Sequence, residues 1–208
     1  MTLKFITFEG GEGTGKSTQA KLLAERLHNA GHEAVLTREP GGSPVAEEIR
    51  ALILKQKPQS PVAEFLLFAA ARAEHLDVTI KPALDRGSFV ICDRYIHSTR
   101  VYQGALGGID SILIADVEAR TVAPYLPAIT FFMDLDPEAG LVRAAQRGAL
   151  NRYDANALAW HRELREAFLR EAQDDRSRSC VLDANRTEAA IAADIWSHVS
   201  TTFNLGQP

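Results

Sequence analysis

The residues best suited to chemistry lie in one glycine-rich stretch near the N-terminus. Gly10, Gly15, Lys16 and Ser17 have the spacing Gly-x-x-x-x-Gly-Lys-Ser, in which glycines allow a tight turn and backbone N–H groups face a phosphate. The lysine then reaches the β- and γ-phosphates, and the serine hydroxyl ligates Mg²⁺. An apolar run precedes the loop and a helical pattern follows it, which predicts a phosphate-binding P-loop. The residues predicted to hold a nucleoside triphosphate are Gly10, Gly11, Glu12, Gly13, Thr14, Gly15, Lys16, Ser17 and Thr18.

A dinucleotide-binding loop of the Rossmann type does not fit this stretch. Counted from Gly11 and Gly13, its third glycine would fall on Lys16.

Glu12 is unusual in a phosphate loop, because its carboxylate repels phosphate. The side chain is tolerable if it points away, toward the hydroxyl of a second substrate; a solvated loop residue is the alternative.

Two further anion or metal candidates follow predicted strands. Asp93 closes the apolar run at residues 88–92, which fits the acidic position that helps hold Mg²⁺ beside Ser17 in P-loop proteins. Arg94 comes next and would project into the same crevice. Arg38 follows a predicted strand at residues 33–37 and is either an anion contact or a surface arginine.

Phe68 and Arg72 are four residues apart on one helix, so they share a face. A ring beside a guanidinium can hold a flat heteroaromatic base, although such a pair more often serves packing. Ser98, Tyr102 and Gln103 add a hydroxyl, a phenol and an amide at helical spacing.

The segment at about 143–154 is locally basic in an acidic chain. Arg143, Arg147 and Arg152 surround Gly148, which predicts a mobile basic lid; a solvated helix end is the alternative.

The chain has 208 residues and a formal net charge of −4, which argues against broad binding of nucleic acid or a membrane surface. We find no signal sequence or apolar run of spanning length, and Cys92 and Cys180 lie in short apolar runs that indicate buried, reduced thiols. We therefore expect a cytoplasmic protein without membrane or nucleic-acid partners.

Five strand-like runs alternate with helical patterns along the whole chain. This order predicts one α/β domain over residues 1–208, with a parallel sheet and helices on both faces. The runs are residues 5–8, 33–37, 88–92, 128–135 and 181–182. In the helices we expect Val45, Ile49, Leu52, Ile53 and Leu66 to face the core.

A P-loop fits a small-molecule kinase, a GTPase-type switch, or an ATPase motor or helicase. The Asn-Lys-x-Asp sequence expected of a GTPase is absent, and a motor needs a larger chain or a basic strand-binding groove. A kinase needs an acceptor pocket and arginines, and both have candidates here. The kinase interpretation is therefore favoured.

The chain resembles the bacterial-type thymidylate kinases nearly end to end. The resemblance rests on the segments at 8–18, 37–42 (Thr-Arg-Glu-Pro-Gly-Gly), 66–72, 93–95, 102–104 (Tyr-Gln-Gly) and 147–148. It implies a P-loop NTPase fold with a lid, and transfer of the γ-phosphoryl group from ATP with Mg²⁺ to dTMP, giving dTDP and ADP in dTTP synthesis. It also implies a homodimer.

By this resemblance Phe68 would stack on thymine, Arg72 would bond its 4-carbonyl, and Gln103 would help position the base. Glu12 would meet the 3′-hydroxyl, and Tyr102 would crowd the 2′-position. The resemblance also implies that Arg38 and Arg94 bind the acceptor phosphate. Lys16, Arg94 and Arg147 would act in catalysis, and Arg143 would lie against adenine.

The lid departs from the family sequence Arg-Gly-Glu-Leu-Asp-Arg. Ala149 and Asn151 replace its two acidic residues, and Ala145 stands where another arginine is sometimes found. Thr14 in the loop and Arg147 in the lid agree with members that carry the catalytic arginine in the lid.

Overall fold

The computed structural model describes residues 2–55, 58, 60–146 and 156–205, and its centre is one parallel sheet. The strand order is β2-β3-β1-β4-β5, and every neighbouring pair is parallel. The bounds are β1 Phe5–Glu9, β2 Ala34–Arg38, β3 Phe89–Asp93, β4 Ile129–Asp134 and β5 Ser179–Asp183. The five predicted strands and the parallel α/β fold are therefore confirmed.

The central strand β1 places the P-loop at the middle of the sheet. Phe5, Ile6 and Phe8 are fully buried between β3 and β4, as apolar strand residues covered on both faces should be. All strands end at the same edge, and β1 and β3 are in register with Phe8 opposite Asp93. The carboxyl ends of β1, β2 and β3 thus bring distant polar residues to one crevice.

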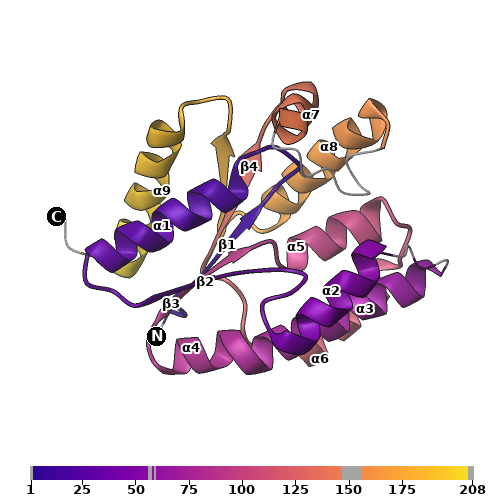
Figure 1. Cartoon of the computed structure of the whole chain (residues 1–208), viewed down its shortest axis with the longest axis horizontal. Coiled ribbons are helices and arrows are strands. Elements are labelled where there is room, and N and C mark those ends of the chain that lie inside the picture. The colour runs from indigo at the N-terminus through magenta and orange to yellow at the C-terminus, as the bar shows by residue number, and fades with distance from the viewer. Residues whose placement is uncertain (1, 56–57, 59, 147–155, 206–208) are drawn as a thin grey trace.

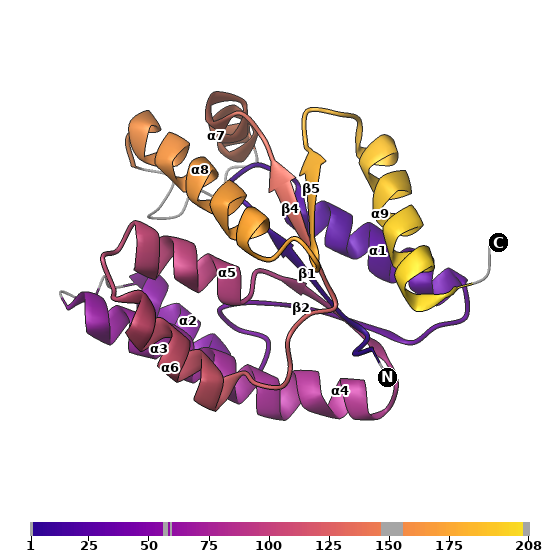
Figure 2. The same ribbon diagram turned by 180° about the vertical axis from the view of Figure 1, so that it is seen from behind.

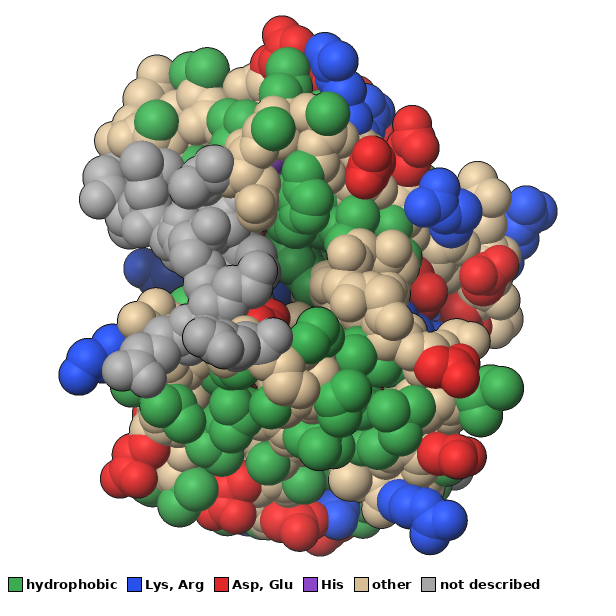
Figure 3. Space-filling view, turned by 90° about the vertical axis from the view of Figure 1, so that its right-hand side faces the viewer, with side chains coloured by type: hydrophobic (Ala, Val, Ile, Leu, Met, Phe, Trp, Pro, Cys, Tyr) green, Lys and Arg blue, Asp and Glu red, His purple; other side chains and the backbone are tan. Residues whose placement is uncertain are grey.

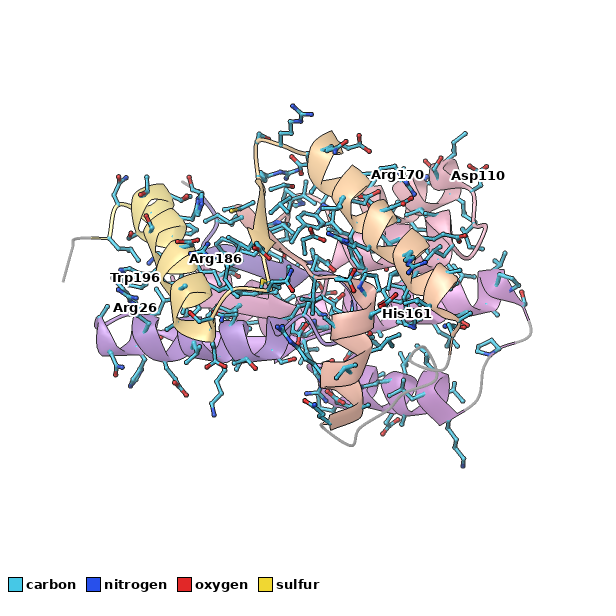
Figure 4. The ribbon with its side chains drawn as sticks, turned by 90° about the horizontal axis from the view of Figure 1, so that it is seen from above. Arg26, Asp110, His161, Arg170, Arg186 and Trp196 are labelled. Carbon is cyan, nitrogen blue, oxygen red and sulfur yellow. The ribbon has the colours of Figure 1, made fainter. Side chains whose placement is uncertain are left out.

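One face of the sheet is covered by two helices, α1 Lys16–Asn29 and α9 Glu188–Phe203 (Figures 1 and 2). Leu23 and Leu27 of α1 and Ile195 of α9 join the large core cluster there. At the surface between these helices, the Arg26 guanidinium lies over the Trp196 ring, 4.4 Å from its centroid (Figure 4). This contact covers the ring while the charge stays in water.

The other face carries more helices, some in a second layer over the first (Figure 2). Their bounds are α2 Pro44–Lys55, α3 Pro61–His75, η1 Leu76–Ile80, α4 Lys81–Asp85, α5 Ile96–Thr99, η2 Arg100–Ala105, α6 Ser111–Thr121 and α8 Leu158–Asp174. Helix α7, Pro137–Gln146, lies beyond the carboxyl end of β4 (Figure 1). Helix α8 packs on β4 and β5, and α3 packs against both α2 and α6.

The predicted helix that ends at Gly87 is continuous, with a π-helical turn, η1, in its middle. Ser60 caps its start by accepting the backbone N–H of Ala63 at 3.3 Å, as the Ser-Pro sequence predicts. In η1 the Lys81 N–H donates to the Leu76 carbonyl, five residues back. Pro82 directly after it has no N–H to continue the regular pattern, which accounts for the local change.

Three side chains expected in the core are instead exposed. Val45, Leu52 and Leu66 are 49%, 48% and 48% exposed, whereas Ile53 is fully buried. The apolar stripe of α2 is wider than the surface that the core can cover. Cys180 is also only half-buried, because its strand is at the sheet edge, while Cys92 is buried; both thiols are free.

In the described part of the chain, every helix is too short or too polar to cross a lipid bilayer.

Candidate active site

The P-loop holds its lysine folded back over the loop. Gly13 and Gly15 adopt φ values of +71° and +88°, which side chains rarely tolerate, and Lys16 begins α1. Its Nζ donates to the Gly11 carbonyl at 2.6 Å and to the Thr14 hydroxyl at 3.2 Å. Burial and then the nearby Arg94 charge lower the pKa of Lys16 to about 8.

A second glycine, from α7, supports this loop from behind. A Cβ on Gly13 would lie 2.0 Å from the Gly140 carbonyl oxygen, and a Cβ on Gly140 would lie 2.6 Å from the Glu12 carbonyl oxygen. Backbone thus meets backbone, so neither position has room for a side chain. Sequence reasoning missed Gly140, although a glycine inside a helical pattern is a signal of close packing.

Ser17 and Asp93 meet as the motif predicts. The Ser17 hydroxyl donates to Oδ2 of Asp93. The other oxygen, Oδ1, is buried and has no hydrogen-bond partner among the described residues. A buried carboxylate oxygen without a donor, next to a hydroxyl, fits a hard cation such as Mg²⁺.

Arg94 has an unusual backbone that directs its side chain into the crevice. Its φ is +72°, and the strain is offset by hydrogen bonds from its N–H to the Phe8 carbonyl (2.9 Å) and from the Cys92 thiol to its own carbonyl (3.0 Å). The guanidinium donates to the Gly10 carbonyl at 3.1 Å and to Glu12 at 2.7 Å. Burial lowers its pKa, but the neighbouring Tyr102 and Glu12 outweigh this and raise it.

Glu12 points away from the phosphate loop, as its charge led us to expect. Besides Arg94, it accepts a hydrogen bond from the Tyr102 hydroxyl at 3.3 Å.

Ser98 is held mainly by Glu9, to which its hydroxyl donates at 2.6 Å. Burial raises the pKa of Glu9, a fully buried carboxyl at the end of β1 that sequence reasoning did not consider.

Arg72 is buried and already paired. Its Nε donates to Glu39 at 2.6 Å, and its Nη2 donates to the Tyr95 carbonyl at 3.0 Å and the Thr99 hydroxyl at 2.8 Å. Burial lowers its pKa, but Glu39 outweighs this and raises it. Within the described residues Nη1 makes no hydrogen bond, which leaves its two N–H groups for a ligand.

Two more arginines face the crevice from β2 and α2. Arg38, half-exposed, pairs with Glu47 at 2.9 Å, and Arg50 donates to the Pro40 carbonyl at 2.7 Å. Burial and then the Arg38 charge lower the pKa of Arg50. Such mutually unfavourable cations are suited to an anion. Sequence reasoning missed Arg50; its place one turn after Glu47, in the helix following the Pro-Gly-Gly loop, was the available signal.

One cavity of about 260 Å³ joins most of the predicted residues. Of these it is lined by Glu12, Gly13, Thr14, Gly15, Lys16, Ser17, Arg38, Phe68, Arg72, Asp93, Arg94, Ser98, Tyr102 and Gln103. Gly10 and Gly11 line a smaller cavity behind the loop, and Thr18 and Arg143 line neither. Arg143 instead donates to the Ala184 carbonyl at 2.9 Å, beside the loop after β5.

The predicted lid lies largely outside the described residues. Arg147, Gly148, Ala149, Asn151 and Arg152 all fall between residues 147 and 155, so the structure does not test their roles.

The P-loop lies at the centre of a parallel sheet and opens into a cavity that Arg38, Arg50 and Arg94 also line. These features define a P-loop kinase that acts on a small molecule. The thymidylate kinase family model matches residues 8–195 of the chain. Over 93% of this chain and 86% of the relative, it is 49% identical to the thymidylate kinase of Nitrobacter winogradskyi. With that of Caulobacter vibrioides the identity is 47%, over 97% and 98% of the two chains.

A solved structure agrees with these matches. The crystal structure of thymidylate kinase from Ehrlichia chaffeensis superposes with a TM-score of 0.76 at 35% identity, covering 94% of this chain and 97% of that one. The chain belongs to the thymidylate kinase family and is a kinase. The reaction that follows from this membership is phosphorylation of dTMP by ATP, with dTDP and ADP as products.

Proposed function

We propose that the two halves of the 260 Å³ cavity hold the two substrates of this reaction. The observation that carries the proposal is that Lys16 and Ser17 line the same cavity as Phe68 and Arg72. A phosphate bound by the loop would therefore face an acceptor bound at the other end. Phosphoryl transfer is mainly a matter of holding two reactants in line and stabilising charge, and this arrangement provides both.

The acceptor phosphate would lie among Arg38, Arg50 and Arg94. All three line the cavity, and Arg94 is anchored by its hydrogen bond to the Gly10 carbonyl. A phosphate carries about two negative charges and accepts several hydrogen bonds, so it relieves the repulsion among these cations.

The base would lie between Phe68 and the polar groups of α3 and η2. Phe68 offers a ring for stacking, and the remaining Nη1 donor of Arg72 suits a 4-carbonyl. Gln103, 4% exposed and 3.4 Å from Glu64, would help to fix the base edge. Glu12 would accept from the 3′-hydroxyl, and Tyr102, hydrogen-bonded to Glu12, would crowd the 2′-position.

Ser17 and Asp93 would hold Mg²⁺ beside the loop. When bound, the ion supplies positive charge to the β- and γ-phosphate oxygens. Lys16 would leave the Gly11 carbonyl and donate to the same phosphates. Because Lys16 is only 6% exposed, water would screen its contacts with the phosphates only weakly.

The lid would complete the donor side. We propose that Arg147 stabilises the transferring phosphoryl group, and that Arg143 lies against adenine near the loop after β5. The Arg143–Ala184 contact supports the second assignment by placing the guanidinium at that loop.

We also propose a homodimer that covers the apolar face of α2, α3 and α6, defined by Val45, Leu52, Val62, Leu66, Ile112 and Leu113. These side chains are 38–69% exposed. Figure 3 shows hydrophobic side chains gathered below the grey segment, over these helices. A patch of this kind on adjacent helices suits a second copy. Sedimentation analysis should give a dimer, and Leu66→Glu should yield monomers; a monomeric parent chain contradicts the proposal.

We further infer that residues 1–208 work as one kinase domain in the cytoplasm. The five strands belong to one sheet, both thiols are unpaired, and the reaction consumes ATP.

The acceptor assignment is tested by ADP release with a panel of nucleoside monophosphates. We expect high activity with dTMP and low activity with its ribonucleotide, AMP, GMP and CMP. Equal activity across the panel would show that Phe68, Arg72 and Tyr102 do not select the acceptor.

A further inference from the structure

A buried chain of hydrogen bonds leads from Thr37, on β2, to Arg72 on α3. The Thr37 hydroxyl lies 2.7 Å from Nε2 of His75, whose Nδ1 lies 3.1 Å from Oε1 of Glu39. The second carboxylate oxygen, Oε2, accepts Nε of Arg72 at 2.6 Å. His75 is fully buried, and Glu39 and Arg72 are 5% and 4% exposed.

The ring orientation follows from these partners. A carboxylate only accepts, so Nδ1 must carry a proton and donate to Glu39. In the neutral ring Nε2 then accepts from the Thr37 hydroxyl, which can rotate to donate. The opposite tautomer would place a lone pair against the carboxylate. Glu39 therefore selects the tautomer of His75, and the Thr37 hydroxyl orients the ring by donating to Nε2.

The ring is also locked by its surroundings. A Cβ on Gly42, whose φ is +86°, would lie 2.3 Å from Nε2 of His75. The Thr79 hydroxyl donates to the Gly42 carbonyl at 2.7 Å. The loop at residues 39–42 is thus fixed to α3 and η1 at the point where His75 meets Glu39.

This cluster does not have the character of a metal site. Ligand atoms of Glu39, His75 and Cys92 lie within 4.8 Å of one another. However, both Glu39 oxygens are occupied by Arg72 and His75, and the Cys92 thiol donates to the Arg94 carbonyl. The guanidinium of Arg72 supplies the positive charge that the carboxylate needs.

We propose that His75 is a positioning residue for acceptor recognition, acting through Glu39 on Arg72. A buried ion pair is favourable only when its remaining hydrogen bonds are satisfied, and His75 satisfies the far oxygen of Glu39. With Nε and Nη2 held, Nη1 is presented to the cavity without a loss of side-chain freedom upon binding. The inference rests on the proposed contact between Arg72 and the 4-carbonyl of the base.

The test compares His75→Leu with His75→Asn, whose amide nitrogen takes about the place of Nδ1. Losing a hydrogen bond to a buried charge costs about tenfold or more in an equilibrium constant. We expect His75→Leu to raise KM for dTMP by at least about tenfold with KM for ATP within about twofold. His75→Asn should restore most of the loss, because it donates to Glu39.

Arg72→Ala separates positioning from general damage. His75→Leu should cause no further rise in the KM for dTMP when Arg72 is already alanine, because it acts through that residue. Additive effects, or an unchanged KM in His75→Leu, overturn the proposal. If Arg72→Ala itself leaves the KM unchanged, the proposed base contact fails and the inference fails with it.

Thr37→Val keeps the test decisive if His75→Leu does not fold. It removes only the hydroxyl that orients the ring and should raise KM for dTMP about fivefold, the value of one neutral hydrogen bond; no change overturns the proposal. Thr130→Val is the matched control, since it removes a buried hydroxyl bonded to Thr7 at 2.9 Å outside the cavity. It should lower Tm without altering the ratio of the two KM values.

Discussion

Arg94 and Glu12 are joined by a 2.7 Å hydrogen bond between Nη2 and Oε1, with both side chains largely buried. The pair connects the residue after β3 to the phosphate loop. Glu12 therefore balances the charge of Arg94 before any substrate binds. Arg94 is held in place while its positive charge remains directed at the cavity.

The planar guanidinium of Arg94 contacts two groups at once, so we predict that a positive charge alone does not support full activity at this position. Arg94→Lys keeps the charge but loses the simultaneous contacts to the Gly10 carbonyl and Glu12. We expect kcat/KM for dTMP to fall about tenfold to a hundredfold, measured by steady-state kinetics. Arg26→Lys on the opposite face of the sheet is the control and should match the parent enzyme. Full activity in Arg94→Lys would argue against a role for the planar guanidinium.

Asp93 is predicted to set the requirement for Mg²⁺. In Asp93→Asn the concentration of Mg²⁺ that gives half-maximal activity should rise at least about tenfold, because a neutral amide is a weaker ligand. The fold should survive, since Oδ1 has no partner among the described residues. Asp110→Asn, which preserves the cap of α6, is the control. An unchanged Mg²⁺ dependence would make Asp93 a structural residue.

We predict that the lid arginine, Arg147, stabilises the transition state of phosphoryl transfer. Arg147→Ala should lower kcat at least about a hundredfold with little change in the KM for dTMP, because the charge would act mainly as the phosphoryl group transfers. Lysine at this position should restore only part of the rate. If Arg152→Ala abolishes turnover while Arg147→Ala is active, the role belongs to Arg152.

Lys16 predicts a pH dependence of ATP binding. Its pKa of about 8 in the free enzyme means that the ammonium loses its proton as the pH rises above that value. ATP binding favours the charged form, so the dissociation constant should increase above pH 8, by up to about tenfold per unit. Calorimetry between pH 7 and 9.5 measures this. Lys16→Arg should bind with a constant that no longer depends on pH there.

His97 predicts a loss of stability in mild acid. Its ring is 1% exposed, has no hydrogen-bond partner among the described residues, and packs 5.1 Å from the Phe132 ring. Burial, followed by the Arg100 charge, lowers its pKa to about 3. Below its ordinary value of about 6.5 the unfolded chain takes up a proton that the folded protein does not. The free energy of unfolding should therefore fall by about 1.4 kcal/mol for each pH unit below 6.5.

Urea unfolding between pH 7 and 5 measures this slope. His97→Phe should flatten it by removing the buried titrating group. His28→Asn, which changes an exposed histidine on α1, should keep the slope of the parent protein. Equal slopes in all three proteins would show that His97 is not the source.

The sequence by itself determined the phosphate loop and the parallel fold. The glycine spacing at residues 10–17 is a local property, since the loop turns within eight residues and helix α1 starts at its end. Alternating strands and helices likewise restrict the topology to a few possibilities. Asp93 was predictable for the same reason, because it terminates a continuous apolar strand.

Tertiary structure alone decided the partners of the predicted side chains. Arg72 finds Glu39, 33 residues away, and Gly13 meets Gly140 across more than a hundred. Helical periodicity wrongly predicted that Val45 and Leu52 face the core, because an apolar stripe does not distinguish a surface facing the core from one facing outward. Arg50 and His75 lie in ordinary helical patterns. Their significance depends on contacts between distant segments, which packing creates and local spacing does not encode.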